Sequence, residues 1–302
     1  MRHYLFIFFL ALCGEVCLAQ SIDSIKYSNG FLFYHEYGKG ETIVLLTGGP
    51  GNNCSQLADM AQKLSISNRV ILLEQRGTGL SIPIPLDSTT INLQTAISDI
   101  NFLLDHLGIK TAIICGHSWG ATLAMCFASS YPKRVKSLIL IAPGPFLMGP
   151  DLYQTVGINM MTRWGRSERK QMDTINQKRS NGTFTNEDSK MSRYLSRLTY
   201  LSDKEKIDSI MPKIDVPMNM QILQLIYKDI NKSKLDLRKS LAVFKKPVFL
   251  IDGRQDMGSY VCYELKIAYP SFKLLWIQNS GHFPMYEQPE LFYRTISEVL
   301  NK

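Results

Sequence analysis

Residues 112–131 constrain the fold most, because they read as a buried strand, a sharp turn and a helix in direct succession. The run at 112–114 is apolar, the segment 116–120 reads G-H-S-W-G, and a helix-forming run follows at 121–125. This context predicts a nucleophile elbow, in which Ser118 stands at the apex of a strained turn. The two flanking glycines allow strand and helix to approach closely. A tight turn without chemistry is the alternative interpretation.

Strand and helix patterns alternate on both sides of this turn. Continuous apolar runs at 42–46, 70–73 and 137–141 predict buried parallel strands, and residues 92–107 have helical spacing that ends at Gly108. A hairpin is expected over 24–40. The alternation resumes with strands at 247–251 and 273–277 and helices around 259–269 and 289–300. We therefore expect an α/β fold with a mostly parallel sheet flanked by helices.

A serine nucleophile needs a base, and the base needs a carboxylate that orients it. The segment that leaves the 247–251 strand carries two candidates, Asp252 and Asp256. Asp256 is favoured because it lies on the loop after the strand. His282 follows the 273–277 strand and is the only histidine after the elbow. The order Ser118, Asp256, His282 is that of an α/β-hydrolase.

Oxyanion stabilisation requires two backbone donors near the nucleophile. Trp119 N–H at the start of the elbow helix is one candidate. Gly49 N–H is the second, in the segment Thr47-Gly48-Gly49-Pro50-Gly51 after the 42–46 strand. A phosphate-binding loop is the alternative, but no Gly-Lys-Ser/Thr follows.

The predicted organisation has three parts. Residues 1–20 combine a basic start, an apolar stretch and a small-residue cleavage pattern, which predicts a secretory signal peptide and an exported protein, periplasmic or secreted. Residues 21–145 and 246–302 form the α/β-hydrolase core. Residues 146–245, rich in charges and helix formers, are expected to form an inserted helical cap. We expect no stable membrane insertion once the signal is removed.

Charge and cysteine content limit the kinds of ligand, metal and macromolecule that this protein is expected to bind. The net charge is +8, and residues 151–245 hold 18 Lys and Arg against 11 Asp and Glu. These basic residues form no dense block and accompany no nucleic-acid motif, so a solvated helical surface is preferred to nucleic-acid binding. Cys54, Cys115, Cys126 and Cys262 show no metal-ligand spacing. We expect neither metal nor organic cofactor, and the oligomeric state is left open.

Five segments together resemble the proline iminopeptidase family of α/β-hydrolase serine peptidases. The 47–51 segment is similar to its H-G-G-P-G loop, and residues 74–81, E-Q-R-G-T-G-L-S, resemble its D-Q-R-G-x-G-x-S segment. The elbow is similar to its G-G-S-W-G, residues 253–256 resemble its G-R-x-D loop, and His282 matches its catalytic histidine. Thr47 departs from the family pattern, which has a histidine there.

The resemblance implies a helical cap, removal of an N-terminal residue such as proline, and cap glutamates that bind the substrate's α-amine. Glu168, Glu187 and Glu205 are the glutamates within 146–245 and hence the amine candidates. The first expectation is thus an aminopeptidase for short peptides. An esterase or lactonase for a small non-peptide substrate is the alternative, and a non-catalytic binding protein with the same fold is the third.

Overall fold

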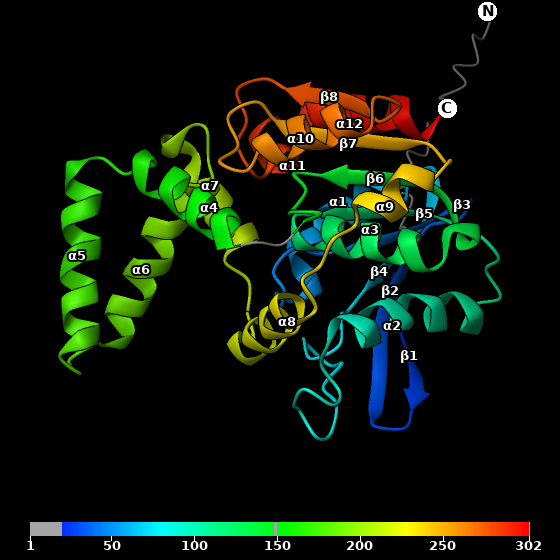
Figure 1. Cartoon of the computed structure of the whole chain (residues 1–302), viewed down its shortest axis with the longest axis horizontal. Helices are drawn as coiled ribbons and strands as arrows, with labels where there is room; N and C mark the ends of the chain where they lie inside the picture. Colours follow the sequence, from blue (N-terminus) through cyan, green and yellow to red (C-terminus); the bar gives the residue numbers. More distant parts are fainter. Residues whose placement is uncertain (1–19, 148–149, 302) are drawn as a thin grey trace, which may run out of the picture.

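The computed structural model describes residues 20–147 and 150–301, which contain one eight-stranded sheet. The strands run in the spatial order β1-β2-β4-β3-β5-β6-β7-β8 (Figure 1). Their bounds are β1 Gln20–Tyr27, β2 Gly30–Tyr37, β3 Glu41–Leu46, β4 Asn68–Leu73, β5 Ala112–His117, β6 Val135–Ile141, β7 Val248–Gly253 and β8 Lys273–Ile277. The predicted signal peptide falls almost wholly outside the described residues.

The sheet is antiparallel at one edge and parallel elsewhere. β1 pairs with β2 and β2 with β4 in antiparallel register, whereas all pairs from β4 to β8 are parallel. Parallel strands end at a common edge, so the loops after β3, β5, β7 and β8 converge there. The segments that carry Gly49, Ser118, Asp256 and His282 follow these four strands and therefore lie at this edge.

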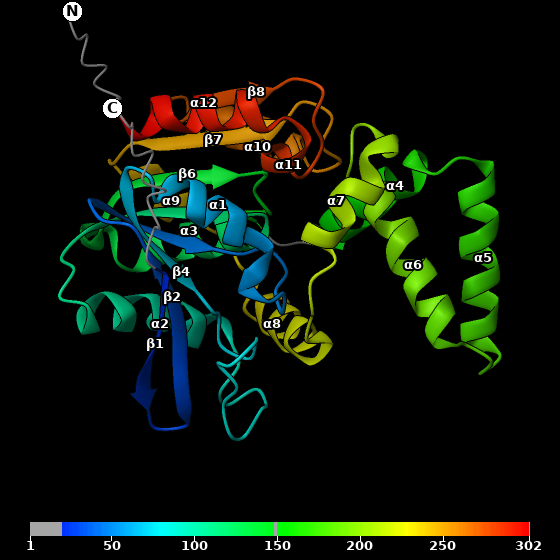
Figure 2. The ribbon, with the colours of Figure 1, turned by 180° about the vertical axis from the view of Figure 1, so that it is seen from behind.

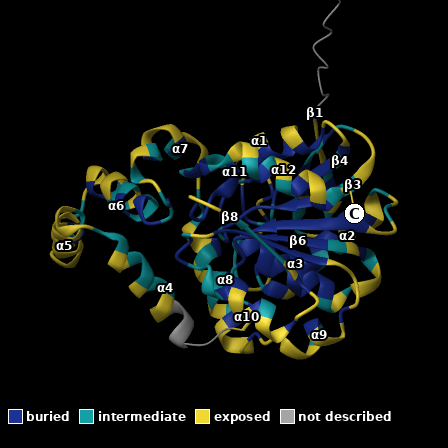
Figure 3. Ribbon diagram, turned by 90° about the horizontal axis from the view of Figure 1, so that it is seen from above, coloured by how far each residue is buried: buried dark blue, intermediate teal, exposed yellow. Residues whose placement is uncertain are grey.

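Alternating side chains of the central strands enter two separate cores, as the pleat of a strand requires. Val44, Ile114 and Leu250 face one core, which α2, α3 and α10 cover. Their neighbours along the strands, such as Leu45 and Ile251, face the second core, which α1 and α12 cover. Both faces of the sheet are therefore shielded from water, and Figure 3 shows the buried strands between more exposed helices.

Helices cover the sheet and fill the connection between β6 and β7. Their bounds are α1 Ala58–Leu64, α2 Leu93–His106, α3 Trp119–Ser130, α4 Pro150–Arg163, α5 Arg166–Ser180, α6 Asn186–Leu198, α7 Ile207–Ile214, α8 Met220–Ser233, α9 Arg238–Val243, α10 Tyr260–Ala268, α11 Pro284–Glu287 and α12 Pro289–Leu300. We call α4 to α9 the helical region. Its α5–α6 pair projects away from the sheet, whereas α8 lies beside α2 (Figures 1 and 2).

The α/β architecture expected from the sequence is confirmed. The strand at 273–277 and the helix at 289–300 have the expected bounds, and the helix expected over 92–107 spans Leu93–His106. β7 extends two residues further than expected, to Gly253, so that Asp252 lies within the strand. Within the described residues, no helix has the length and apolar character needed to cross a membrane.

Candidate active site

Ser118 occupies the turn between β5 and α3. Its backbone has φ 54° and ψ −118°, a conformation that non-glycine residues rarely adopt outside strained functional turns. The flanking glycines permit this turn, because a Cβ on Gly116 would lie 2.2 Å from the Gly120 carbonyl oxygen. A Cβ on Gly120 would lie equally close to the Leu46 carbonyl oxygen. The G-x-S-x-G spacing is thus required by the contact between β3, β5 and α3.

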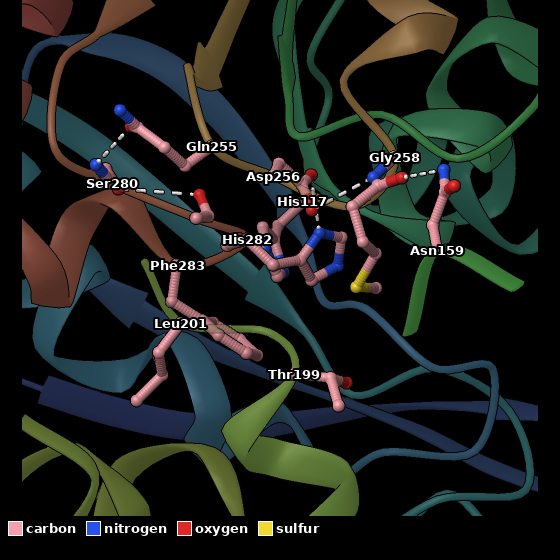
Figure 4. A network of polar contacts seen from close by, with 12 residues as sticks. His117, Asn159, Thr199, Leu201, Gln255, Asp256, Gly258, Ser280, His282 and Phe283 are labelled. Atoms are coloured by element: carbon pink, nitrogen blue, oxygen red, sulfur yellow. Dashed lines mark hydrogen bonds and ion pairs between the residues drawn. The ribbon is translucent and has the colours of Figure 1, made fainter. Parts of the chain in front are cut away.

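His282 and Asp256 meet at the same edge of the sheet. His282 Nδ1 lies 2.8 Å from Asp256 Oδ2, and the second carboxylate oxygen accepts from Gly258 N–H at 3.2 Å (Figure 4). A carboxylate can only accept, so Nδ1 carries the proton that His282 donates to Asp256. Burial opposes ionisation of Asp256, but His282 and the hydrogen bonds outweigh it and lower the pKa of this carboxyl.

Ser118 and His282 line a common cavity of about 160 Å³. Gly49 and Trp119 line it as well, so both sequence-predicted oxyanion donors belong to residues at this cavity. Gly49 has φ +125°, which explains a glycine at this point of the loop. The structure therefore brings together the five residues chosen for catalysis and oxyanion binding.

Gln75, from the segment that follows β4, connects the two parts of the predicted oxyanion site. Its side-chain nitrogen donates to the Thr47 carbonyl at 2.9 Å, and its side-chain oxygen accepts from the Trp119 indole N–H at 3.0 Å. The loop after β3 and the start of α3 are thus cross-linked. Thr47 takes part through its hydroxyl, 3.1 Å from the same Gln75 nitrogen. A threonine can therefore occupy the position where the similar family has histidine.

The cavity wall is apolar and aromatic. Among the described residues, His282 is the only titratable imidazole, ammonium, guanidinium or carboxyl group in the lining. Tyr260 also lines the cavity, and its hydroxyl is buried without a hydrogen-bond partner. Burial raises the pKa of Tyr260 to about 12, so it is a neutral donor. The lining thus combines apolar groups with several hydroxyl groups and the His282 imidazole, and it holds no Asp, Glu, Lys or Arg side chain.

The helical region reaches the site through residues 199–202. His282 N–H donates to the Tyr200 carbonyl at 2.7 Å, and the two rings lie 5.1 Å apart between centroids. Arg163 at the end of α4 donates to the carbonyls of Thr199 and Leu201 and to that of Gln255. This guanidinium therefore joins the helical region to the loop that carries Asp256.

Glu287 fastens the loop that holds His282. This buried carboxylate accepts from the N–H groups of Gly281, Phe283 and Ser202 at 2.9, 3.2 and 2.7 Å. Burial raises its pKa, although the three backbone donors act in the opposite direction. Sequence reasoning missed Glu287 and Gln75. Gln75 could have been found, since it lies in the 74–81 segment, but nothing in the sequence marks Glu287 apart from its position five residues after His282.

The ring of His117 packs against the ring of His282. Its Nε2 lies 2.8 Å from the His282 carbonyl oxygen, so this nitrogen carries the proton and donates. Burial, with the neighbouring His282 ring, lowers the pKa of His117 to about 3. His117 is hence a neutral, hydrogen-bonded histidine within the core.

The three amine candidates lie away from the cavity lining. Glu168 is bound by Lys204 at 2.9 Å, and Glu187 is exposed beside Lys190. Glu205 is exposed at the start of a short 3₁₀ turn. None of the three is among the residues that line the cavity.

One cluster in the described part of the chain has the side chains of a metal site. His35, Cys54 and Glu74 bring one ligand atom each to within 4.8 Å of one another. Glu74 also accepts a hydrogen bond from the Asn53 side chain at 3.3 Å. Burial of the Cys54 thiol and, to a lesser extent, the negative charge of Glu74 raise the pKa of this thiol to about 12. One oxygen of the Glu74 carboxylate is thus hydrogen-bonded, whereas the other is buried without a hydrogen-bond partner.

Comparison with known proteins assigns this chain to a family. Residues 41–289 match the family described as alpha/beta hydrolase fold, and the chain belongs to it. It is 26% identical over 279 residues to the proline iminopeptidase of Heyndrickxia coagulans, covering 90% of this chain and 94% of the relative. It is also 26% identical over 282 residues to 2-hydroxy-6-oxononadienedioate/2-hydroxy-6-oxononatrienedioate hydrolase 2 of Pseudomonas putida, covering 89% and 91%.

A solved structure agrees with the fold. An alpha/beta fold family hydrolase from Bacillus anthracis str. Sterne superposes with a TM-score of 0.70 at 17% identity, covering 92% of this chain and 99% of that one. The similarity to the proline iminopeptidase family expected from the motifs is therefore supported, and hydrolases are its relatives. The identity to the peptidase from Heyndrickxia coagulans and to the hydrolase from Pseudomonas putida is the same, 26%.

Proposed function

We propose that this protein is a serine hydrolase that forms an acyl-enzyme on Ser118. The observation that carries this proposal is the 2.8 Å contact between His282 and Asp256 beside a serine in an elbow turn. Ser118 attacks the substrate carbonyl while His282 Nε2 takes its proton and later protonates the leaving group. Asp256 keeps the imidazole in the required tautomer. Water then releases the acyl group by the same steps.

The N–H groups of Gly49 and Trp119 hold the oxyanion in this proposal. Gln75 supports the arrangement, because it ties the loop after β3 to α3 and so fixes the spacing of the two donors. Preorganised donors of this kind each contribute about 3 kcal/mol to the lowering of the activation barrier.

The cavity favours a small acyl group without charge. Its volume of about 160 Å³ suits an acyl unit of a few heavy atoms, and its lining offers no carboxylate for an ammonium group. An esterase or lactonase-type substrate is therefore the class that the geometry supports best.

An aminopeptidase is the second candidate, and the relatives named proline iminopeptidase favour it. A prolyl ring would also suit the apolar, aromatic lining. In that case the α-amine would need an anchor outside the cavity lining, and Glu168, Glu187 and Glu205 remain the candidates in the helical region. If the predicted signal peptide directs export, the enzyme acts outside the cytoplasm.

One set of assays separates these functions. Hydrolysis of p-nitrophenyl acetate, prolyl-β-naphthylamide and N-acetylprolyl-β-naphthylamide is compared between the wild type and Ser118→Ala. Ester turnover without amide turnover, lost in the variant, is expected for the first candidate. Turnover of the free-amine prolyl substrate alone would establish the aminopeptidase. If a serine-reactive phosphonate fails to label the wild type, the protein is a binding protein and both candidates are wrong.

A further inference from the structure

Asp252 is a buried carboxyl group close to Asp256, the proposed carboxylate of the catalytic triad. It lies in β7 with no exposed surface, and neither of its oxygens accepts a hydrogen bond from the residues that the structure describes. Its polar neighbours are the Asp256 carboxylate, the Cys262 thiol and the Gly253 backbone. A buried ionised carboxylate without a cation or donors would be strongly disfavoured.

The turn after β7 creates this contact. Asp256 N–H donates to the Gly253 carbonyl at 3.0 Å, which folds the loop back over the end of the strand. The Asp256 carboxylate is then held on two sides, by His282 and by Gly258 N–H. Asp252, which lies within β7, interacts electrostatically with the same carboxylate. Two ionised carboxylates would both be acceptors, so a hydrogen bond between them requires a proton on one.

The charges around the pair decide which group carries that proton. Asp256 faces His282, which stabilises its ionised form. Asp252 faces Cys262 from α10, a fully buried thiol that donates weakly and supplies no positive charge. Tyr260 and Glu287 also lie near Asp256, and neither is a cation. Burial, followed by the negative charge of Asp256, raises the pKa of Asp252 well above its usual range.

We infer that Asp252 is a positioning residue: it stays protonated and donates a hydrogen bond to Asp256, which holds the Asp256 carboxylate toward His282. This inference rests on the proposed function, because Asp252 acts only through Asp256 and His282. The donated hydrogen bond withdraws negative charge from Asp256 and so limits how strongly that carboxylate stabilises the imidazolium. Asp252 therefore sets both the orientation and the basicity of His282.

A direct measurement of protonation tests the inference without relying on activity. The full-length protein is labelled with [4-¹³C]aspartate, and the carboxyl signals are recorded by NMR and infrared spectroscopy at neutral pH. We expect one protonated aspartate signal that is present in the wild type and in the control Asp173→Asn, an exchange on the exposed side of α5. It should be missing in Asp252→Asn. A wild type with no protonated aspartate would overturn the inference.

The pH dependence of kcat/KM tests the role. Asp252→Ala removes the donor, so kcat/KM should fall about 30-fold and the acidic limb should move up by about one pH unit. Asp252→Asn keeps a donor and should stay within about threefold of the wild type. A shift of the limb to lower pH in Asp252→Asn would mean that a negative charge had been removed, and would contradict a neutral Asp252. Unchanged kinetics in Asp252→Ala would contradict the positioning role.

These outcomes separate the inference from the proposed function. If the wild type neither labels with phosphonate nor turns over an ester, the proposed function fails while the carboxyl spectrum still reports the state of Asp252. If the wild type is active and the spectrum lacks the protonated signal, only the inference fails. Should Asp252→Asn prove unstable, the wild-type spectrum alone decides whether a protonated aspartate exists.

Discussion

The sheet edge and the helical region, the two parts of the molecule that meet around the cavity, differ in how firmly their residues are held. Every residue of β5 and β7 is buried, whereas α5 buries only Met172 and Ile175 along its length. At the sheet edge, one wrong side chain collides with a neighbouring strand or helix. On α5, most positions face water. The strands of the sheet edge therefore constrain which residue can stand at each position, whereas most positions of α5 carry no such constraint.

Removal of the nucleophile is the most severe test of this contrast. Ser118→Ala should lower kcat about 10⁴-fold or more with little change in stability, because the hydroxyl makes the covalent bond and fills little space. Steady-state hydrolysis and thermal unfolding measure the two effects. Ser130→Ala, at the exposed end of α3, is the matched control and should behave as the wild type. Substantial activity left in Ser118→Ala would place the nucleophile elsewhere.

Glu287 joins the loop that carries His282 to Ser202 of the helical region, and its replacement tests this connection. Glu287→Ala leaves the N–H groups of Gly281, Phe283 and Ser202 without their acceptor, at a cost of about 3 kcal/mol in the free energy of unfolding. Activity should fall as well, since the loop that carries His282 loses its fixed position. Urea denaturation and kcat/KM are the measurements. The control is Glu298→Ala, an exposed change on α12 that should alter stability by less than about 0.5 kcal/mol.

Burial at the sheet edge also predicts a pH effect on stability. The pKa of His117 is about 3 in the folded protein and near 6.5 when unfolded, so the unfolded chain alone takes up a proton below pH 6.5. Folding stability is therefore lost as the pH falls, by about 2 kcal/mol from this residue between pH 6.5 and 5. Unfolding free energies at several pH values should decline less steeply in His117→Gln.

Its control is the exposed histidine at the end of α2. His106→Gln changes an exposed side chain and should alter the free energy of unfolding by less than about 0.5 kcal/mol. Parallel declines in the wild type and in His117→Gln would show that His117 is protonated in the folded protein.

The smallest effect is expected in the helical region. Glu168→Gln removes the charge that pairs with Lys204, and a partly exposed pair of this kind contributes about 0.5 kcal/mol or less. Since Glu168 does not line the cavity, KM for either substrate class should change less than about twofold. A large rise in KM for the prolyl substrate alone would instead identify Glu168 as the amine anchor and reverse the preference for an ester.

Local patterns predicted the sheet edge well, because each motif there satisfies a short-range requirement. The glycines at 116 and 120 are demanded by contacts within the elbow, and the apolar runs are demanded by burial on both faces of a parallel sheet. The helical region gave a composition but no ordered motif. Its charges pair in ways that depend on how α5, α6 and the 3₁₀ turn at 204–206 pack, as Glu168 and Lys204 show.

By itself, the sequence determined the α/β architecture, the elbow at Ser118 and the short set of residues that could serve it. Tertiary structure decided between Asp252 and Asp256, since only the turn after β7 brings one of the two carboxylates to His282. The tertiary structure also brought Gln75 and Glu287 to the site, where they form hydrogen bonds to segments that are distant along the chain. The physical reason is range: turns and burial act between neighbours in sequence, whereas hydrogen-bond partners in a folded core are chosen by the packing of the whole chain.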